Sequence, residues 1–146
     1  MMNSPEKLSI LFAASEAAPF AKEGGLGDVV GALPTYLSRM GHDARVVIPR
    51  YYSVNREKFN LRPLPGTLVV PMGIIGNQYC AVLEGRLPGS DVPIYFLEHE
   101  GYYGRAGLYQ QDGEGYLDND NRFVFLSKAA LELCKMLDFR PDVVHA

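Results

Sequence analysis

Apolar and polar residues follow one another along the first fifty positions in the order that a strand, a loop, a helix and a second strand require. Leu8 to Ala14 is a continuous apolar run, and its length predicts a strand covered on both faces, as in a parallel sheet. A glycine-rich loop at 23–27 precedes a predicted helix over about 28–40, and Gly41 is placed to end it. Ala44 to Ile48 is the next buried strand. Together these elements predict one βαβ unit.

The predicted first helix carries an apolar stripe that would face the sheet. Its members are Val30, Leu33, Leu37 and Met40. Pro34 lies inside the same segment and should bend the helix or shift its start, because proline lacks the backbone donor that an inner turn needs.

The middle of the chain has a different pattern. Thr67–Met72 and Gln78–Leu83 are two short runs joined by a glycine-containing turn, which predicts a hairpin, and Val92–Leu97 is another buried strand. The segment from His99 to Leu117 is rich in glycine and tyrosine. It predicts a long loop, and loops of this length inside a domain tend to be functional or mobile.

A second helix is expected over 119–136, because apolar residues recur there at spacings of three and four. This core stripe consists of Phe123, Leu126, Ala130, Leu133 and Leu137. Arg140 and Pro141 should end the helix, and Asp142 to His145 begins another strand. Ala146 stands near the carboxyl end of that strand, the edge where open α/β sheets bind ligands, so we expect an incomplete domain.

Composition narrows the class of protein. The chain has 146 residues, the length of one domain, with a net charge of -3 and a pI of about 5.6, which argues against broad electrostatic binding to nucleic acid or to an anionic membrane. No run approaches the roughly 20 apolar residues of a membrane helix, and no secretory signal is present, so we expect a cytoplasmic protein, or a plastid one if the source is a plant or alga. Cys80 and Cys134 form no CxxC pair and are expected to be reduced, buried thiols.

The glycine loop between the first strand and the first helix has the residues of an anion site. Gly24 and Gly25 allow the backbone to approach a ligand closely, and amides at a helix N-terminus favour phosphate. Lys22 adds a full positive charge beside them. Such a group suits a pyrophosphate that becomes a leaving group, since bond cleavage adds negative charge there.

The residues alone leave alternatives open at this loop. It matches neither G-x-G-x-x-G nor a Walker loop, and a plain strand-to-helix turn with a solvated Lys22 fits as well. We expect Asp28 to cap the helix and make no phosphate contact, because an acid would repel phosphate. Glu16 is either a hydrogen-bond acceptor that orders the loop or a ligand for substrate.

The same loop resembles the N-terminal signature of bacterial glycogen synthases and plant starch synthases, S-E-x-x-P-x-x-K-x-G-G-L-x-D-V. The matching residues are Ser15, Glu16, Pro19, Lys22, Gly24, Gly25, Leu26, Asp28 and Val29. Glu23 departs from the family, which has Thr or Val there, and adds an acid near the anion site. Other segments similar to the family are Gly41–Tyr51, Tyr109, Asp118–Phe123 and Pro141–Ala146.

This resemblance implies a fold and an activity. The fold would be α/β, the Rossmann-like N-terminal domain of a GT-B glycosyltransferase, with a mostly parallel sheet, flanking helices and a β-hairpin insertion. Residues 1–146 would form a truncated N-terminal catalytic domain without the C-terminal donor-nucleotide domain, inactive by itself. The whole enzyme would transfer glucose from ADP-glucose to the non-reducing end of an α-1,4-glucan, with retention and without a metal or cofactor.

The resemblance also assigns residues to the site. Lys22 would bind the phosphates of ADP-glucose, and Gly24 and Gly25 would place their amides beside the pyrophosphate and the reacting sugar. Tyr109 and Asn119 would line the glucose or acceptor cleft, although a loop aromatic and a helix cap are the simpler interpretations. No catalytic residue is expected within the chain.

The remaining histidines and arginines carry no such signal. His145 is expected to support the core or the strand end, and His42 and His99 to be exposed loop residues. Arg50, Arg105 and Arg122 are expected to be solvated or structural.

Two other functions remain open. A nucleotide-binding oxidoreductase domain shares the strand-loop-helix start, and Arg50 after the second strand would suit NADP better than NAD. A non-catalytic glucan-binding module would use some of the nine tyrosines and seven phenylalanines to stack on sugars.

Overall fold

Seven strands form one sheet in the computed structural model, which describes residues 4–146. The order is β3-β5-β6-β2-β1-β9, and β4 pairs with β5 alongside this path. The parallel part comprises β1 (Ser9–Ala13), β2 (Asp43–Pro49), β6 (Pro93–Glu98) and β9 (Val143–His145). The antiparallel part comprises β3 (Arg62–Pro63), β4 (Leu68–Pro71) and β5 (Asn77–Arg86).

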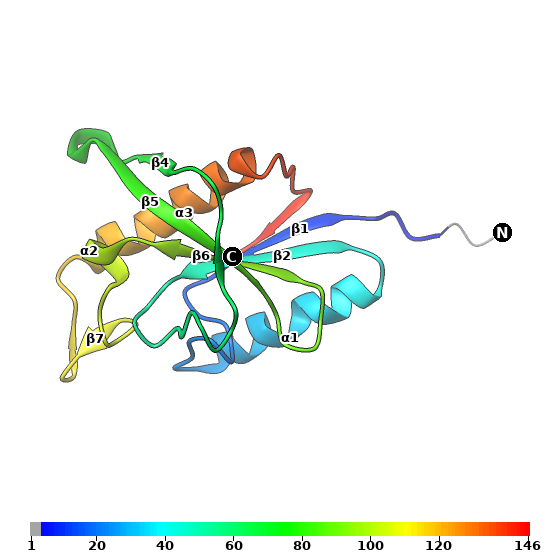
Figure 1. Cartoon of the computed structure of the whole chain (residues 1–146), viewed down its shortest axis with the longest axis horizontal. Coiled ribbons are helices and arrows are strands. Elements are labelled where there is room, and N and C mark those ends of the chain that lie inside the picture. The colour runs from blue at the N-terminus through cyan, green and yellow to red at the C-terminus, as the bar shows by residue number, and fades with distance from the viewer. Residues whose placement is uncertain (1–3) are drawn as a thin grey trace.

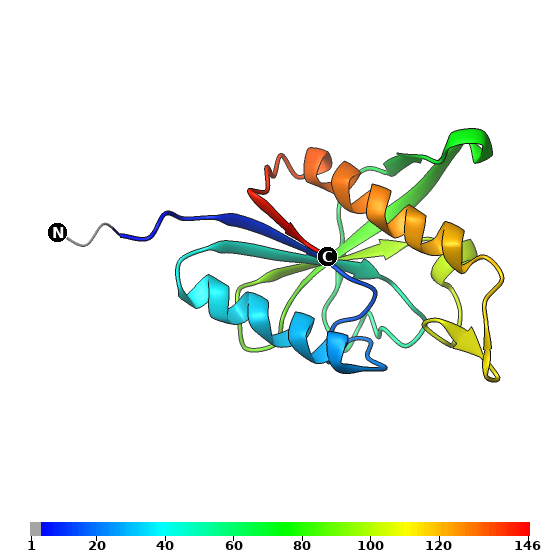
Figure 2. The same cartoon turned by 180° about the vertical axis from the view of Figure 1, so that it is seen from behind.

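Two long helices cover opposite faces of this sheet (Figures 1 and 2). They are α1 (Gly25–Arg39), which follows β1, and α3 (Asn119–Met136), which precedes β9. Central strand residues such as Leu11, Val47 and Phe96 are fully buried between the two helical layers. The continuous apolar runs in the sequence therefore correspond to strands covered on both faces, and the expected α/β fold is confirmed.

The predicted helix α1 is present, with corrections at both ends. It begins at Gly25, three residues before the predicted start, so part of the glycine loop is helical. Gly41 ends it as expected, with a φ of +99°, and the amide of His42 donates to the carbonyl of Leu37 at 3.1 Å, as in a Schellman motif. The helix continues across Pro34, and Met40, expected in the core stripe, is 65% exposed.

The predicted helix over 119–136 has the bounds of α3, but its buried stripe lies partly on other residues. Leu126, Ala130 and Leu133 are buried as expected, whereas Phe123 and Leu137 are only half-buried. The buried positions that the pattern missed are Arg122, Phe125, Ala129 and Cys134. The core-facing stripe is therefore wider than the one read from the sequence.

The hairpin in the middle of the chain is confirmed, and the long loop after β6 contains short elements of its own. The chain passes from β4 to β5 through a 3₁₀ turn, η1 (Gly73–Ile75), and the two strands pair antiparallel. Between β6 and α3 lie a one-turn helix, α2 (Glu100–Tyr103), and a small hairpin of β7 (Gln110–Gln111) with β8 (Glu114–Gly115). This segment is therefore ordered by local turns and by contacts with the rest of the chain.

Other features of the described residues bear on the class of protein. Cys80 and Cys134 are free and buried, as predicted. Across residues 4–146, no helix combines the length and the apolar character that crossing a bilayer requires.

Candidate functional site

The candidate site lies at the carboxyl edge of the parallel strands, where three connections meet. Glu16 follows β1, Tyr51 follows β2, and Tyr109 belongs to the long segment that follows β6. The carboxyl ends of parallel strands share one edge of the sheet, so residues far apart in the sequence come together there.

The buried carboxylate of Glu16 is the centre of this arrangement. Its side chain is only 2% exposed, and its Oε1 atom accepts hydrogen bonds from the amides of Gly24 at 3.0 Å and Gly27 at 2.8 Å. Gly24 is the N-cap of α1 and has no side chain with which to cap the helix. Glu16 therefore caps α1 from the preceding loop, where a negative charge also interacts favourably with the helix dipole.

The expectation that Asp28 caps this helix is wrong. Asp28 lies within the first turn of α1, and its carboxylate pairs with the ammonium of Lys22 at 3.1 Å. The sequence suggested the nearest acidic residue as the cap, whereas the acid that reaches the free amides is Glu16, eleven positions before Gly27.

Hydrogen bonding keeps the Glu16 carboxyl ionised although it is buried. Burial by itself would raise its pKa. The hydroxyl of Tyr109, at 2.8 Å from Oε2, and the amides of Gly27, Gly24 and Glu23 outweigh that effect, so the pKa is lowered from its ordinary value of 4.5. Of the two roles left open for Glu16, these contacts establish the ordering of the loop, and contact with substrate stays a prediction.

Tyr109 connects the long segment after β6 to the glycine loop. Its hydroxyl donates to Glu16 and also lies 2.6 Å from Oγ of Ser15, so the Ser15 hydroxyl is the donor in that second contact. Burial raises the pKa of Tyr109 to about 12, which keeps the phenol protonated. Tyr51 adds a hydrogen bond from its hydroxyl to the carbonyl of Ser15 at 2.7 Å. Tyr109 is therefore more than a loop aromatic.

Asn119 holds Tyr109 in place from the start of α3. Its Nδ2 atom donates to the carbonyl of Tyr109 at 2.9 Å, and its Oδ1 atom accepts from Nη1 of Arg122 at 2.8 Å. Asp118, the N-cap, makes no capping bond and instead binds Arg105 through both carboxylate oxygens. The side-chain amide of Asn119 is thus used within the chain, and the side chain of Asp118 does not cap α3.

Arg122 has the structural one of the two roles expected for it, and it holds this network together from a buried position. It is fully buried, and its guanidinium donates to the carbonyls of Tyr102 at 2.6 Å and Leu108 at 2.9 Å as well as to Asn119. A signal was present in the sequence, because Arg122 occupies a core-facing position three and four residues before Phe125 and Leu126.

Lys22 lies at the exposed side of the same loop. Its ion pair with Asp28 is open to solvent, with 46% of the lysine side chain and 61% of the aspartate side chain exposed. In the part of the chain that the structure describes, the amides of Gly25 and Leu26 have no acceptor, since Glu16 takes those of Gly24 and Gly27. A cation and two bare amides therefore lie side by side at the N-terminus of α1.

Two glycines are sterically required for this geometry. A methyl group on Gly27 would lie 2.9 Å from Cγ of Lys22, and one on Gly31 would lie 2.5 Å from the carbonyl oxygen of Ala18. Both distances are shorter than a Cβ atom can approach another atom, so the backbone or the neighbouring residue would have to move. The loop can pack against α1 only because these positions lack side chains.

The three histidines lie outside this network, and two of them correct the sequence reading. His99 caps α2 by accepting the amide of Tyr102 at 3.1 Å, and His42 accepts the amide of Leu8 at 3.1 Å. His145 stacks on Phe12 with ring centroids 4.8 Å apart, which fits a structural role at the strand end. Among residues 4–146, no three His, Cys, Asp or Glu side chains gather as a metal ion would need.

Comparisons with known proteins show the family of the chain. A family model described as the starch synthase catalytic domain matches residues 9–146. Glycogen synthase 1 of Geobacter metallireducens is 72% identical over 141 residues, covering 97% of this chain and 28% of that protein. The glycogen synthase of Clostridium botulinum is 45% identical over 138 residues, covering 94% of this chain and 27% of that protein.

A solved structure from a plant has the same fold. The catalytic domain of Starch Synthase IV from Arabidopsis thaliana, bound to ADP and acarbose, superimposes with a TM-score of 0.81 at 30% identity. The match covers 96% of this chain and 28% of that one. The chain thus spans little more than a quarter of the length of the proteins it matches.

Proposed function

The chain belongs to the starch synthase catalytic domain family, and from that premise we propose that it forms the first part of the N-terminal domain of a glycogen or starch synthase. The enzyme transfers glucose from ADP-glucose to the non-reducing end of an α-1,4-glucan with retention of configuration. The C-terminal domain that completes the GT-B cleft lies outside these 146 residues. The bacterial relatives favour a cytoplasmic enzyme over the plastid alternative.

The observation that supports this proposal most is that Lys22 and the free amides of Gly25 and Leu26 lie together at the N-terminus of α1. We assign the diphosphate of the donor to this group. The amide of Gly24, which was also expected beside the pyrophosphate, donates to Glu16 at 3.0 Å, so the amide of Leu26 takes its place in this assignment. As the bond to glucose breaks, negative charge accumulates on the diphosphate, and fixed donors at a helix N-terminus stabilise that charge most where it increases. ADP in the plant structure is what remains of ADP-glucose after glucose has left.

The ion pair between Lys22 and Asp28 does not prevent this role. An exposed ion pair is worth about 0–1 kcal/mol. A charge-assisted hydrogen bond from lysine to phosphate is worth about 1.5–3 kcal/mol, so Lys22 gains by exchanging Asp28 for the donor. The acids Glu23 and Asp28 lower the affinity for the anion, and the exposed lysine offsets part of that repulsion.

Glu16, Tyr109 and Asn119 support the loop from behind in this proposal. Glu16 binds the amides of Gly24 and Gly27, which flank the two free amides in the sequence, and so holds the backbone at the start of α1 in place. Tyr109 and Asn119 couple this loop to the segment after β6. Contact of Tyr109 and Asn119 with glucose or acceptor remains part of the proposal.

The alternatives have less support. An NADP site would need Arg50 for the 2′-phosphate, and no other feature of the described residues points to a dinucleotide. The family match across nearly the whole chain likewise favours a transferase over an oxidoreductase. It also favours an enzyme over a non-catalytic glucan-binding module.

The test is Lys22→Ala in a full-length enzyme carrying this sequence. We expect kcat/KM for ADP-glucose to fall at least tenfold, which corresponds to at least ~1.4 kcal/mol. Lys128→Ala is the matched control, because Lys128 is an exposed lysine on α3, and it should leave kcat/KM unchanged. Unchanged kinetics in Lys22→Ala would remove the assignment of Lys22.

A further inference from the structure

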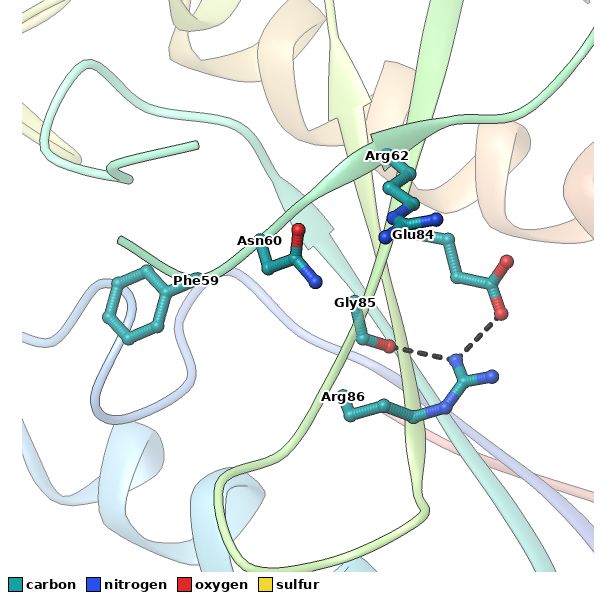
Figure 3. Close-up of a pocket in the computed structure, with 6 residues that line it drawn as sticks. All are labelled: Phe59, Asn60, Arg62, Glu84, Gly85 and Arg86. Carbon is teal, nitrogen blue, oxygen red and sulfur yellow. Dashed lines mark hydrogen bonds and ion pairs between the residues drawn. The ribbon is translucent and has the colours of Figure 1, made fainter. Parts of the chain in front are cut away.

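A polar cavity lies at the open edge of the sheet, where β3 stops pairing with β5 (Figure 3). Its volume is about 330 Å³. Its lining residues are Phe59, Asn60, Arg62, Glu84, Gly85 and Arg86. None of them belongs to the proposed donor site, so the cavity needs an explanation of its own.

The strand register explains why the charged side chains converge. Arg62 of β3 is directly opposite Glu84 of β5, so their side chains project from the same face of the sheet. Arg86 is two residues further along β5 and projects from that face as well. Figure 3 shows the two arginines on either side of Glu84 and Gly85, with the amide of Asn60 directed toward Gly85.

The guanidinium groups in this cavity are only partly neutralised. Nη1 of Arg86 donates to Glu84 Oε1 at 2.7 Å and to the carbonyl of Gly85 at 3.0 Å. Arg62 forms no ion pair with any residue in 4–146. The lining residues therefore carry a formal charge of about +1 in a chain whose net charge is -3, and such a local excess favours an anion.

The cavity combines these cations with neutral and anionic hydrogen-bonding groups. Arginine side chains present paired N–H donors that match the oxygens of a phosphate group. The carboxylate of Glu84, the carbonyl of Gly85 and the amide of Asn60 offer acceptors and a donor for hydroxyl groups. A volume near 330 Å³ is at the low end for small-molecule sites, which suits a monosaccharide and not a glucan chain.

We propose that this cavity binds a phosphorylated monosaccharide, with the phosphate between Arg62 and Arg86 and the sugar hydroxyls on Glu84 and Asn60. This site is separate from the one proposed for the nucleotide-sugar donor. It does not depend on Lys22, so failure of one proposal leaves the other standing.

Isothermal titration of glucose 1-phosphate into a full-length enzyme carrying this sequence tests the proposal. We expect saturable binding, weakened at least tenfold by Arg62→Gln and by Arg86→Gln. Arg140→Gln, at an exposed arginine outside the cavity, is the matched control and should bind as the wild type does. Binding that is lost in Lys22→Ala but kept in both arginine variants would place the ligand at the donor site and overturn the proposal.

Two further arms separate a phosphate site from general charge effects. Glu84→Gln removes the acid of the cavity that repels phosphate, and it releases Arg86. The affinity for inorganic phosphate should therefore rise about threefold or more. An unchanged or lower affinity contradicts the proposed position of the phosphate.

Inorganic phosphate should bind the wild type more weakly than glucose 1-phosphate does. Equal affinities would overturn the proposed hydroxyl contacts and leave a site for free phosphate.

Discussion

The N-termini of α1 and α3 lie at the same edge of the sheet but are occupied in opposite ways. The start of α1 is capped by Glu16, a residue earlier in the same β1–α1 connection, and the amides of Gly25 and Leu26 remain free. The start of α3 is closed by its own neighbours, because the amide of Asn119 donates to the carbonyl of Tyr116 at 3.2 Å and that of Asn121 donates to Oδ1 of Asp120 at 2.8 Å. A helix N-terminus is therefore available to a ligand only where local side chains leave it open.

The difference comes from the residues that precede each helix. The glycines at the start of α1 have no side chains that could cover the free amides. The buried carboxylate of Glu16 binds only the amides of Gly24 and Gly27. Before α3, Tyr116 packs against the guanidinium of Arg105, with 4.7 Å from Cζ to the ring centroid, and Asp118 binds the same guanidinium. The first arrangement suits binding of an anion, and the second suits fixing a long segment in place.

The largest effect should come from Arg122, which holds the closed helix start. Arg122→Met removes three hydrogen bonds and leaves the buried carbonyl of Leu108 and the partly buried acceptors of Tyr102 and Asn119 without this donor. An unpaired buried acceptor costs about 1–3 kcal/mol, so we expect the free energy of unfolding in urea to fall by roughly 3 kcal/mol or more. Arg140→Met, at an exposed site, is the control. A loss below about 1 kcal/mol would show that this end of α3 is not held as described.

A smaller effect, dependent on pH, is expected at the open helix start. Glu16→Gln keeps the shape of the side chain but provides one acceptor oxygen in place of two, so the free energy of unfolding should fall by about 1–3 kcal/mol at pH 7. The pKa of Glu16 is lowered from its ordinary value of 4.5, so its ionised form stabilises the fold above that pH, and this contribution is lost as the pH falls through the lowered pKa.

The difference between wild type and Glu16→Gln should therefore shrink below pH 4.5. Urea unfolding at a series of pH values measures it. In a full-length enzyme, the same variant should raise the KM for ADP-glucose, since the loop amides lose their fixed direction. A difference in stability that stays constant from pH 7 to acid would contradict the role of the charge on Glu16.

The smallest effect is expected for Asp118→Asn at the closed start. The ion pair between Asp118 and Arg105 is partly exposed, and such pairs contribute about 0–1 kcal/mol. Thermal unfolding should detect that small loss, and the KM of the full-length enzyme for ADP-glucose should not change. If this variant raised the KM as much as Glu16→Gln, the distinction between an open and a closed helix start would be wrong.

The sequence by itself determined the elements and the family. Apolar runs and helical periodicity depend on which side chains are buried, and that information is local, so the βαβ start and the bounds of α3 were predicted closely. The signature around Lys22, Gly24 and Gly25 carried the family resemblance, which the comparisons confirmed.

Only the tertiary structure decided how the site is held. Glu16 caps α1 in place of Asp28, and Tyr109 reaches Glu16 across 93 positions. Arg122, for which a solvated and a structural role were both open, is fully buried. Capping preferences in the sequence describe neighbours along the chain. The order of strands in the sheet sets which distant segments meet at its carboxyl edge, and a buried charge is stable only where those segments supply its hydrogen-bond partners.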